Sequence, residues 1–330
     1  MNEHFIKNIE IKNFKCFEDF KAEGFGRVNL IGGKNNVGKT AFMEAVYINT
    51  YSKNIELMAH AISAVNFSRY KLRYIGRQIS PLNLDMIDID KNLQKTPLLD
   101  ISSNLNSSFF KVNQGEGKIE YRFIINGKET LINKNLFSYT LNPTPEKLTV
   151  FLDNFGFLDE DLEKMYKIIQ YLEVEGIISG LINNFELNIK EFKVFSDGIA
   201  RCKNKDNIYQ DLNEFGDGLK RYISIICSIL VCSKGYLFID EIENGIHYTN
   251  LDKLWEIILT ISEEQNVQIF ATTHSKECIE SYARVAKRLE DEEITFIELG
   301  KNKEDEIKAM VYPYDWFIDE VEQNHEVRGW

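Results

Sequence analysis

An eight-residue run, GKNNVGKT from Gly33 to Thr40, has the composition of a phosphate-binding loop. It fits the pattern G-x-x-x-x-G-K-[ST] at every fixed position, follows the apolar run VNLI and precedes a helical pattern. The glycines let backbone N–H groups face phosphate oxygens, and the helix N-terminus adds the positive end of its dipole. The motif therefore predicts a site for ATP, formed by Gly33, Lys34, Asn35, Asn36, Val37, Gly38, Lys39 and Thr40. Lys39 would reach the β- and γ-phosphates, and the Thr40 hydroxyl would bind Mg²⁺.

Two adjacent carboxylates, Asp240 and Glu241, end the apolar run GYLFID. A carboxylate at this place binds Mg²⁺, directly or through a water, opposite a phosphate loop, which is the Walker B role. We expect Asp240 to hold the metal and Glu241 to polarise the attacking water. The alternative is two exposed acids at a strand end, and the phosphate loop in the same chain argues against it.

A second buried strand is predicted at IFATTHS, and it ends in the polar residues Thr273, His274 and Ser275. Sites in parallel sheets gather at the carboxyl ends of strands. We therefore expect Thr273 and His274 to lie beside the acidic pair, with His274 in contact with the γ-phosphate.

Composition limits the class of protein. The chain has 330 residues and a net charge of −12, with 44% hydrophobic and 27% charged residues, as in globular proteins. At about 150 residues per domain, this length indicates two domains or one domain with an inserted lobe. An acidic chain is a poor candidate for coating DNA non-specifically, because phosphate affinity comes from clustered Lys and Arg.

The five cysteines are scattered and form no C-x-x-C pair, and the five histidines show no metal-ligand spacing. A disulfide framework and a zinc site are therefore not expected, and a reduced, cytoplasmic interior is the better interpretation. The N-terminus has no signal-peptide pattern. The longest apolar stretch, 222–232, is too short and too polar to span a bilayer and predicts a buried helix.

Periodicity predicts an α/β fold with a mixed or parallel core sheet, an antiparallel β subdomain and a helical lobe. Strands are expected at 5–11, 27–32, 98–140, 186–195, 235–240, 267–273 and 294–299, with Asn126-Gly127 as a hairpin turn. Helical patterns occupy 40–65, 146–185, 218–233, 250–264 and 275–289. Residues 68–97 and 311–330 give no clear pattern, and the charged stretch 301–310 predicts a solvated loop or turn.

These pieces together resemble the ABC-type ATPase heads of the RecF/SMC/Rad50 and OLD kind, and most closely the stand-alone bacterial ATPases of the AAA-15/AAA-21 group. IKNIEIKNFKCFEDF resembles that group's opening strand pair, IGGKNNVGKT its Walker A motif, LFIDEIENGIH its Walker B motif and D-loop, and IFATTHS its H-loop. The resemblance implies one P-loop NTPase head over 1–330. It divides into a core (1–65 and 186–300), an antiparallel insert (66–145), a helical lobe (146–185) and a C-terminal extension (301–330).

The same resemblance assigns three further segments. Gly216, Asp217 and Gly218 take the place of the ABC signature but depart from its L-S-G-G pattern, with Gly216 at the position of the serine. Glu243 and Asn244 fall in the D-loop, and Gln78 is the nearest candidate for the Q-loop. The implied assembly is a head-to-tail homodimer, or a higher oligomer, with ATP between the Walker motifs of one copy and the signature of the other. A plain turn before a helix is the alternative for the signature-like segment.

Two features of these heads are missing from the sequence. No long heptad tract lies between Thr40 and Phe215 and no C-x-x-C hook occurs, so the coiled-coil arm of Rad50 and SMC proteins is not expected. The residues after 300 are too few for the nuclease domain of OLD proteins. A nuclease or toxin would then be a separate partner.

Three functions remain open. The first is an ATP-hydrolysing dimer that controls a partner effector, in bacterial anti-phage defence or toxin regulation. The second is a RecF-like DNA-repair ATPase, whose DNA contacts would come from the basic run Arg69, Lys71, Arg73 and Arg77; a solvated face is the alternative for that run. The third is a nucleotide-gated scaffold with little turnover, which the altered signature favours. No membrane partner is expected.

Overall fold

The structure, a computed structural model, describes residues 3–74, 99–115, 118–133, 149–154, 156–157 and 159–323. The chain divides into two compact units. Unit 1 comprises Met1–Gly24, Asn36–Glu146 and Gly300–Met310, and unit 2 comprises Phe25–Asn35, Lys147–Leu299 and Val311–Trp330. The boundary passes through the phosphate loop between Asn35 and Asn36, so Lys39 and Thr40 belong to unit 1 and the acidic pair belongs to unit 2.

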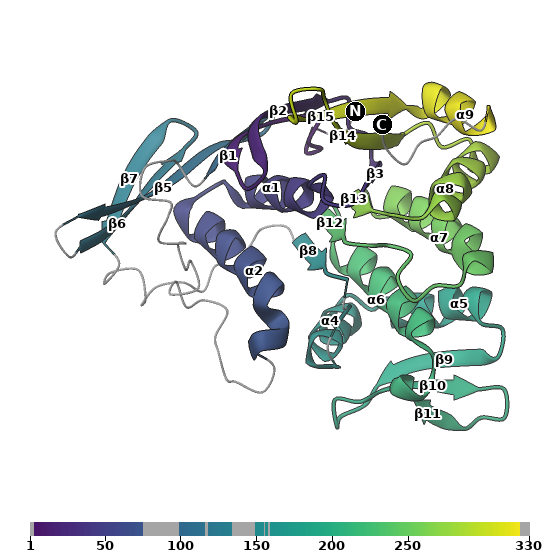
Figure 1. The fold of residues 1–330 in the computed structure, drawn as a ribbon. Coiled ribbons are helices and arrows are strands. Elements are labelled where there is room, and N and C mark those ends of the chain that lie inside the picture. The colour runs from purple at the N-terminus through teal and green to yellow at the C-terminus, as the bar shows by residue number, and fades with distance from the viewer. Residues whose placement is uncertain are drawn as a thin grey trace. The chain divides into compact units, whose positions relative to one another are not determined.

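The core of unit 2 is a six-stranded sheet with the order β15-β14-β3-β13-β12-β8, whose edge strand β15 begins in unit 1 and ends in unit 2 (Figure 1). Its strands are β3 (Val28–Gly33), β8 (Thr149–Leu152), β12 (Tyr236–Ile239), β13 (Gln268–Thr272), β14 (Ile294–Lys301) and β15 (Ile307–Pro313). The pairs β14/β3, β3/β13, β13/β12 and β12/β8 are parallel. The predicted parallel sheet with crossover helices is confirmed, and the carboxyl ends of β12 and β13 lie side by side.

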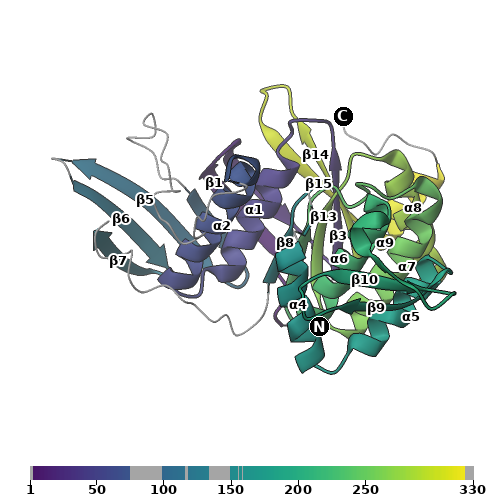
Figure 2. The same cartoon turned by 90° about the horizontal axis from the view of Figure 1, so that it is seen from below.

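Helices pack along one face of this sheet (Figure 2). They are α6 (Asp217–Val231), α7 (Leu251–Glu264) and α8 (Lys276–Leu289), followed after β15 by α9 (Tyr314–Glu322). On the other face, the rings of Phe151, Phe238 and Phe270 stack across β8, β12 and β13. Both faces of the central strands are therefore buried.

A smaller lobe of unit 2 consists of α4 (Asp159–Tyr171), α5 (Glu175–Phe185) and the antiparallel strands β9 (Ile189–Val194), β10 (Ala200–Asn204) and β11 (Tyr209–Asp211). Its interior continues into the main core of unit 2, because Tyr222 of α6 stacks on Phe185 at the end of α5. Two short 3₁₀ turns, η2 (Leu212–Glu214) and η3 (Tyr248–Asn250), precede α6 and α7.

Unit 1 contains an antiparallel sheet with the order β2-β1-β4-β5-β6-β7. The strands are β1 (Asn8–Phe14), β2 (Phe17–Glu23), β4 (Leu99–Ser103), β5 (Ser107–Gly115), β6 (Lys118–Ile125) and β7 (Lys128–Asn133). The predicted hairpin is confirmed: Ile125 pairs with Lys128, and Asn126 and Gly127 have φ values of 48° and 80°. Helix α1 (Lys39–Tyr51) contacts this sheet through Phe42 and Phe20.

Three predictions about local structure were wrong, and two short strands were not predicted. The helical pattern at 40–65 is two helices, α1 and α2 (Ile55–Tyr74), because the Ser52 hydroxyl bonds back to Ile48 and Asn54 accepts the Leu57 N–H as a new N-cap. The pattern at 146–185 hides strand β8, whose four residues are too few to show a period against the helices that follow.

The stretch 301–310 is not entirely a loop, since β15 begins at Ile307. Only the first strand of the small antiparallel sheet was expected, since β10 and β11 are short and half-buried. Within the described residues, no helix is long and apolar enough to cross a membrane.

Candidate active site

The phosphate loop leads from the end of β3 into α1. Gly33 is the last residue of β3, and Gly38 is the N-cap of α1 with a φ of 89°. No side chain caps α1, and its first turn carries no acidic residue. The N-terminal end of the helix is therefore suited to an anion, as the motif predicts.

Gly38 is required for a second reason, which is close packing within unit 1. A Cβ at this position would lie 2.6 Å from Cys16 Sγ and 3.2 Å from the Phe17 ring. Cys16 lies in the turn between β1 and β2, and Phe17 is the first residue of β2. This strand pair therefore packs against Gly38 and leaves no room for a larger side chain there.

The two ends of the loop differ in exposure. Lys34, Asn35 and Asn36 are exposed, whereas Lys39 is buried and Thr40 half-buried. Nearby, Lys15 forms an ion pair with the buried Glu44 of α1, which ties the β1–β2 turn to the helix that carries Lys39.

The acidic pair lies directly after β12, as expected. Thr272, at the end of the adjacent strand β13, donates its hydroxyl to Asp240 Oδ1 at 2.6 Å and accepts the N–H of Glu241 at 2.8 Å. The residue that bonds the acids is Thr272, whereas Thr273 was the residue expected beside them. Because successive side chains of a strand point to opposite faces, Thr272 faces the pair, while Thr273 is buried and its hydroxyl accepts the Ser275 N–H.

His274 is brought to Glu241. Its Nε2 lies 3.5 Å from Glu241 Oε1, and both side chains are partly exposed. The neighbouring Glu243 holds the backbone at this point, because its Oε1 accepts the N–H groups of His274 at 2.8 Å and Ser275 at 3.1 Å. A candidate base and a candidate γ-phosphate ligand therefore emerge together from two buried parallel strands.

Glu241 has an unusual backbone conformation, with a φ of 50°. The left-handed region costs a residue with a side chain about 1–2 kcal/mol. Arg221 of α6 supports this turn, since its Nη2 donates to the carbonyls of Asp240 and, at 3.2 Å, Glu241, while Nη1 donates to Asp153 at 2.6 Å. Non-glycine residues in such conformations cluster at functional sites.

Arg221 also supplies charge to the site. Its side chain is 5% exposed, and burial lowers its pKa, an effect opposed by four carboxylates: Asp153, Asp240, Glu243 and Glu241. Its Nε is buried without a partner in the described part of the chain. The buried guanidinium of Arg221 thus extends from α6 to the residues that follow β12.

The signature-like and D-loop segments touch each other within unit 2. A Cβ at Gly218 would lie 2.6 Å from the Gly245 carbonyl oxygen. Gly245 has a φ of 76°, and a Cβ there would lie 3.2 Å from Asp217 Cβ. In contrast, nothing lies within 4 Å of a Cβ built at Gly216, which is exposed. Asn244 donates to the Asn154 carbonyl at 2.7 Å and so anchors the other side of the D-loop.

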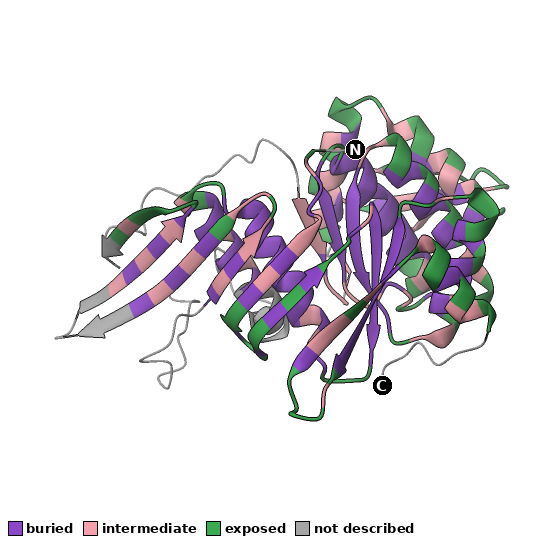
Figure 3. Ribbon diagram, turned by 90° about the horizontal axis from the view of Figure 1, so that it is seen from above, coloured by how far each residue is buried: buried purple, intermediate pink, exposed green. Residues whose placement is uncertain are grey.

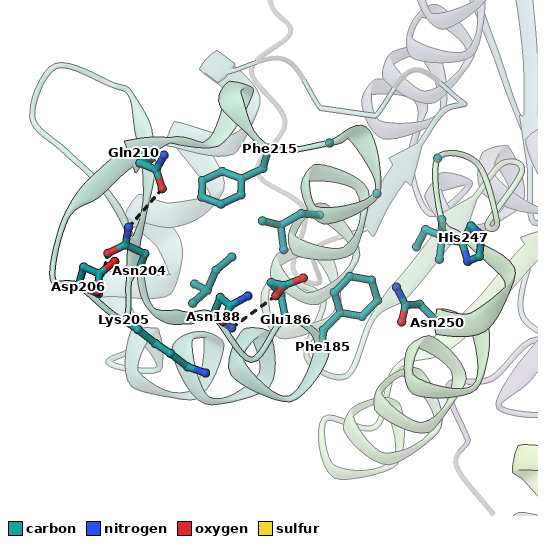
Figure 4. A pocket seen from close by; sticks show the side chains of 16 residues that line it. Phe185, Glu186, Asn188, Asn204, Lys205, Asp206, Gln210, Phe215, His247 and Asn250 are labelled. Atoms are coloured by element: carbon teal, nitrogen blue, oxygen red, sulfur yellow. Dashed lines mark hydrogen bonds between the residues drawn. The ribbon is translucent and has the colours of Figure 1, made fainter.

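A pocket of 610 Å³ adjoins these two segments (Figure 4). Gly216 and Gly218 line one part of its wall, and Gly245 and His247 line another. Aromatic and amide side chains contribute much of the remaining wall, together with charged and aliphatic ones: Phe185, Phe215, Asn188, Asn204, Gln210, Asn250, Glu186, Lys205, Asp206, Ile189, Leu219 and Ile246. This pocket does not include Asp240, Glu241 or His274.

Two other predictions fall partly outside what can be described. Arg69, Lys71 and Arg73 belong to helix α2, whereas Arg77 and the Q-loop candidate Gln78 lie outside the described residues. No group of three or more His, Cys, Asp or Glu side chains arranged to hold a metal occurs in the described ranges.

The sequence did not reveal Arg221, Thr272 and the carboxylate role of Glu243. Thr272 is signalled only by its place at the end of a predicted strand. Arg221 occupies an ordinary position in α6, and no sequence pattern indicates that its side chain is buried.

The chain is similar to several known ATPases. Residues 152–280 match the family model described as "AAA domain, putative AbiEii toxin, Type IV TA system". An "ATP/GTP phosphatase" of Helicobacter pylori is 24% identical over 86% of this chain and 88% of its own length. A "DNA replication and repair protein RecF" of Clostridioides difficile is 29% identical over 62% of this chain and 61% of its own length.

Among solved structures, the Smc head domain from Pyrococcus furiosus, determined with an extended coiled coil and bound to the C-terminal domain of ScpA, has the same fold. The TM-score is 0.50, with 10% sequence identity over 97% of this chain and 99% of that one. The fold is therefore that of a P-loop NTPase. The motifs and the similar sequences support an ATPase head that resembles those of the RecF/SMC/Rad50 type.

Proposed function

We propose that this chain hydrolyses Mg-ATP in a head-to-tail dimer and that the ATP cycle controls a separate effector protein. One observation carries the proposal: Glu241 and His274 lie 3.5 Å apart at the carboxyl ends of two neighbouring parallel strands, with Asp240 beside them. This is the edge of an α/β sheet where ligands bind.

Each residue has a part in attack by water on the γ-phosphate. Glu241 accepts the proton of the water, and His274 holds a γ-phosphate oxygen. Lys39 and the backbone N–H groups of the loop bind the β- and γ-phosphates and stabilise the charge that develops there. Arg221 and Thr272 hold the backbone of Glu241, so the carboxylate is already in place when the nucleotide arrives.

The oxygen donors on the two motifs suit Mg²⁺. The carboxylate of Asp240 and the hydroxyl of Thr40 are hard oxygen ligands, and Mg²⁺ is commonly held by one or two such groups together with substrate phosphates. Thr272 occupies Asp240 Oδ1 by a hydrogen bond and so orients the carboxylate. When bound, the ion would neutralise phosphate charge.

The test is Glu241→Gln, which keeps the shape of the side chain and removes the base. Phosphate release should fall by about 10²–10⁴-fold, the usual contribution of a general base, while ATP still binds. Lys39→Ala should instead abolish nucleotide binding. If the wild-type chain releases no phosphate above background with Mg-ATP, hydrolysis is wrong and the scaffold function is favoured.

The dimer is tested with the same variant. Gly218 of the signature-like segment packs against Gly245, which follows the D-loop residues Glu243 and Asn244. A second copy that binds one of these two segments would therefore also contact the other. Glu241→Gln should therefore accumulate as an ATP-bound dimer, measured as a doubled mass by light scattering. A monomeric mass at saturating ATP would contradict the head-to-tail arrangement.

The effector proposal is supported by similarity alone. The matching family description names a toxin–antitoxin system. A nuclease or toxin that co-purifies with the chain, and whose activity changes between wild type and Glu241→Gln, would support control of an effector in anti-phage defence. An effector indifferent to that substitution would refute it.

DNA binding is the second candidate function. Arg69, Lys71 and Arg73 belong to α2, and the chain is similar to RecF. Changing Arg69, Lys71, Arg73 and Arg77 to Glu should abolish a salt-sensitive gel shift. Absence of any shift by the wild-type chain at low salt would rule this function out.

A further inference from the structure

The carboxylate of Glu243 faces the H-loop. Oε1 accepts two backbone N–H groups, from His274 and Ser275, at 2.8 and 3.1 Å. Oε2 is buried without a hydrogen-bond partner in the described part of the molecule. A buried oxygen without a partner costs stability, so folding alone does not account for a carboxylate at this position.

Glu243 is also rigidly connected to the candidate base. It lies two residues after Glu241 in a turn closed by two hydrogen bonds, from Asn244 N–H to the Glu241 carbonyl and from Ile246 N–H to the Glu243 carbonyl, both 2.9 Å. Glu241 and His274 are therefore connected in two ways. The turn that contains Glu243 links Glu241 to the backbone of His274, and the imidazole Nε2 lies 3.5 Å from Glu241 Oε1, which closes the path.

From this closed path we infer that Glu243 is the positioning residue for His274. Its carboxylate fixes the backbone from which the imidazole projects, and so fixes the separation between the γ-phosphate ligand and the base. The inference rests on the proposed function and adds a residue to that site. Glu243 was assigned only to the D-loop by sequence, and its side chain acts within its own copy.

A purely structural role is the competing explanation. Glu243 lies beside the N-terminus of α8, where any carboxylate stabilises the helix dipole. Glu277, in the first turn of α8, provides a matched control. Its Oε2 accepts the Ser275 hydroxyl at 2.8 Å, whereas the His274 N–H donates to Glu243 Oε1.

The test uses the full chain labelled with ¹³C at the histidine rings, which gives few signals because the sequence has five histidines. The His274 signal is assigned by its loss in His274→Ala. Glu243→Ala should shift this signal, whereas Glu243→Gln, which keeps an acceptor oxygen, and Glu277→Ala should not. In phosphate-release assays, Glu243→Ala should lower kcat by about 10–100-fold with little change in KM, because the substitution misplaces His274 and does not weaken ATP binding.

The inference is overturned if Glu243→Ala leaves the His274 signal in place, or if Glu277→Ala reduces kcat equally. Should Glu243→Ala fail to fold, Glu243→Asp takes its place, because it keeps the charge but withdraws the oxygens by one methylene. If the wild-type chain proves inactive, the proposed function fails, and the ring signals still decide whether Glu243 positions His274.

Discussion

The two large sheets of this protein are buried in different ways, and Figure 3 shows the difference along each strand. In unit 2, every residue of β3, β12 and β13 is buried. In unit 1, β2 and β4 alternate between buried and more exposed residues. Parallel sheets are covered on both faces, whereas antiparallel sheets commonly keep one face in water.

This difference indicates why the candidate catalytic residues emerge from unit 2. A strand packed on both faces has no freedom to twist or slip, so the residues at its end inherit a fixed position. Asp240 directly follows β12, and His274 lies two residues after the end of β13. Unit 1 contains the N-terminus of α1, which is a helix end suited to an anion through its backbone N–H groups, so that side-chain precision matters less there.

The largest effects are expected when two neighbouring side chains are truncated in one strand of each sheet. In β12, Phe238 and Ile239 are both fully buried, so Phe238→Ala and Ile239→Ala should each lower the free energy of unfolding by about 2–5 kcal/mol. In β6, Phe123→Ala should cost as much, but Ile124→Ala only about 1 kcal/mol, because Ile124 is half-buried. Urea unfolding measures all four, and equal losses at Phe123 and Ile124 would contradict the one-sided sheet.

A smaller effect is expected at the loops of unit 2. Gly218→Ala should destabilise the protein by about 1–3 kcal/mol, because the new Cβ meets the Gly245 carbonyl, which is backbone and cannot rotate away. Gly216→Ala is the control, since its Cβ would meet nothing within 4 Å. Thermal unfolding that ranks the two variants equally would show that the loop contact is loose.

Unit 1 should respond to the loss of a local cap. Asn54 begins α2 by accepting the Leu57 N–H at 2.8 Å, so Asn54→Ala should cost about 1 kcal/mol. Lys53→Ala, next to it and exposed, should change the free energy of unfolding by less than about 0.5 kcal/mol. A loss at Lys53 as large as at Asn54 in urea unfolding would exclude capping as the cause.

The smallest effect concerns a surface ion pair of unit 2. Arg284, with Ser281, lowers the pKa of Asp252 below its unfolded value of about 3.9. The stabilisation is therefore present above that pH and is lost as the pH falls through the lowered folded pKa. Asp252→Asn should cost less than about 1 kcal/mol at pH 7, since solvent screens the pair, and the difference should shrink in acid. A difference that grows on acidification would reverse the assignment.

Local patterns predicted most of the core of unit 2. The strand before Asp240, Tyr236–Ile239, is wholly apolar, and the strand before His274, Gln268–Thr272, has the apolar residues Ile269, Phe270 and Ala271 at its centre. The hairpin at Asn126-Gly127 was equally clear, because that turn needs two residues that tolerate positive φ. Strand β8 was missed because its four residues are too few to show a period. The end of α1 at Ser52 was missed because it involves a hydrogen bond from the Ser52 hydroxyl to the Ile48 carbonyl of the same helix.

The sequence by itself determined the chemistry of this protein. Fixed spacing places Lys39 and Thr40 after a glycine loop, and two acids and a histidine at the ends of buried strands. Only the tertiary structure decided which side chains hold them. Arg221, Thr272 and Glu243 act through long-range contacts to backbone atoms, and such contacts leave no period or spacing in the chain.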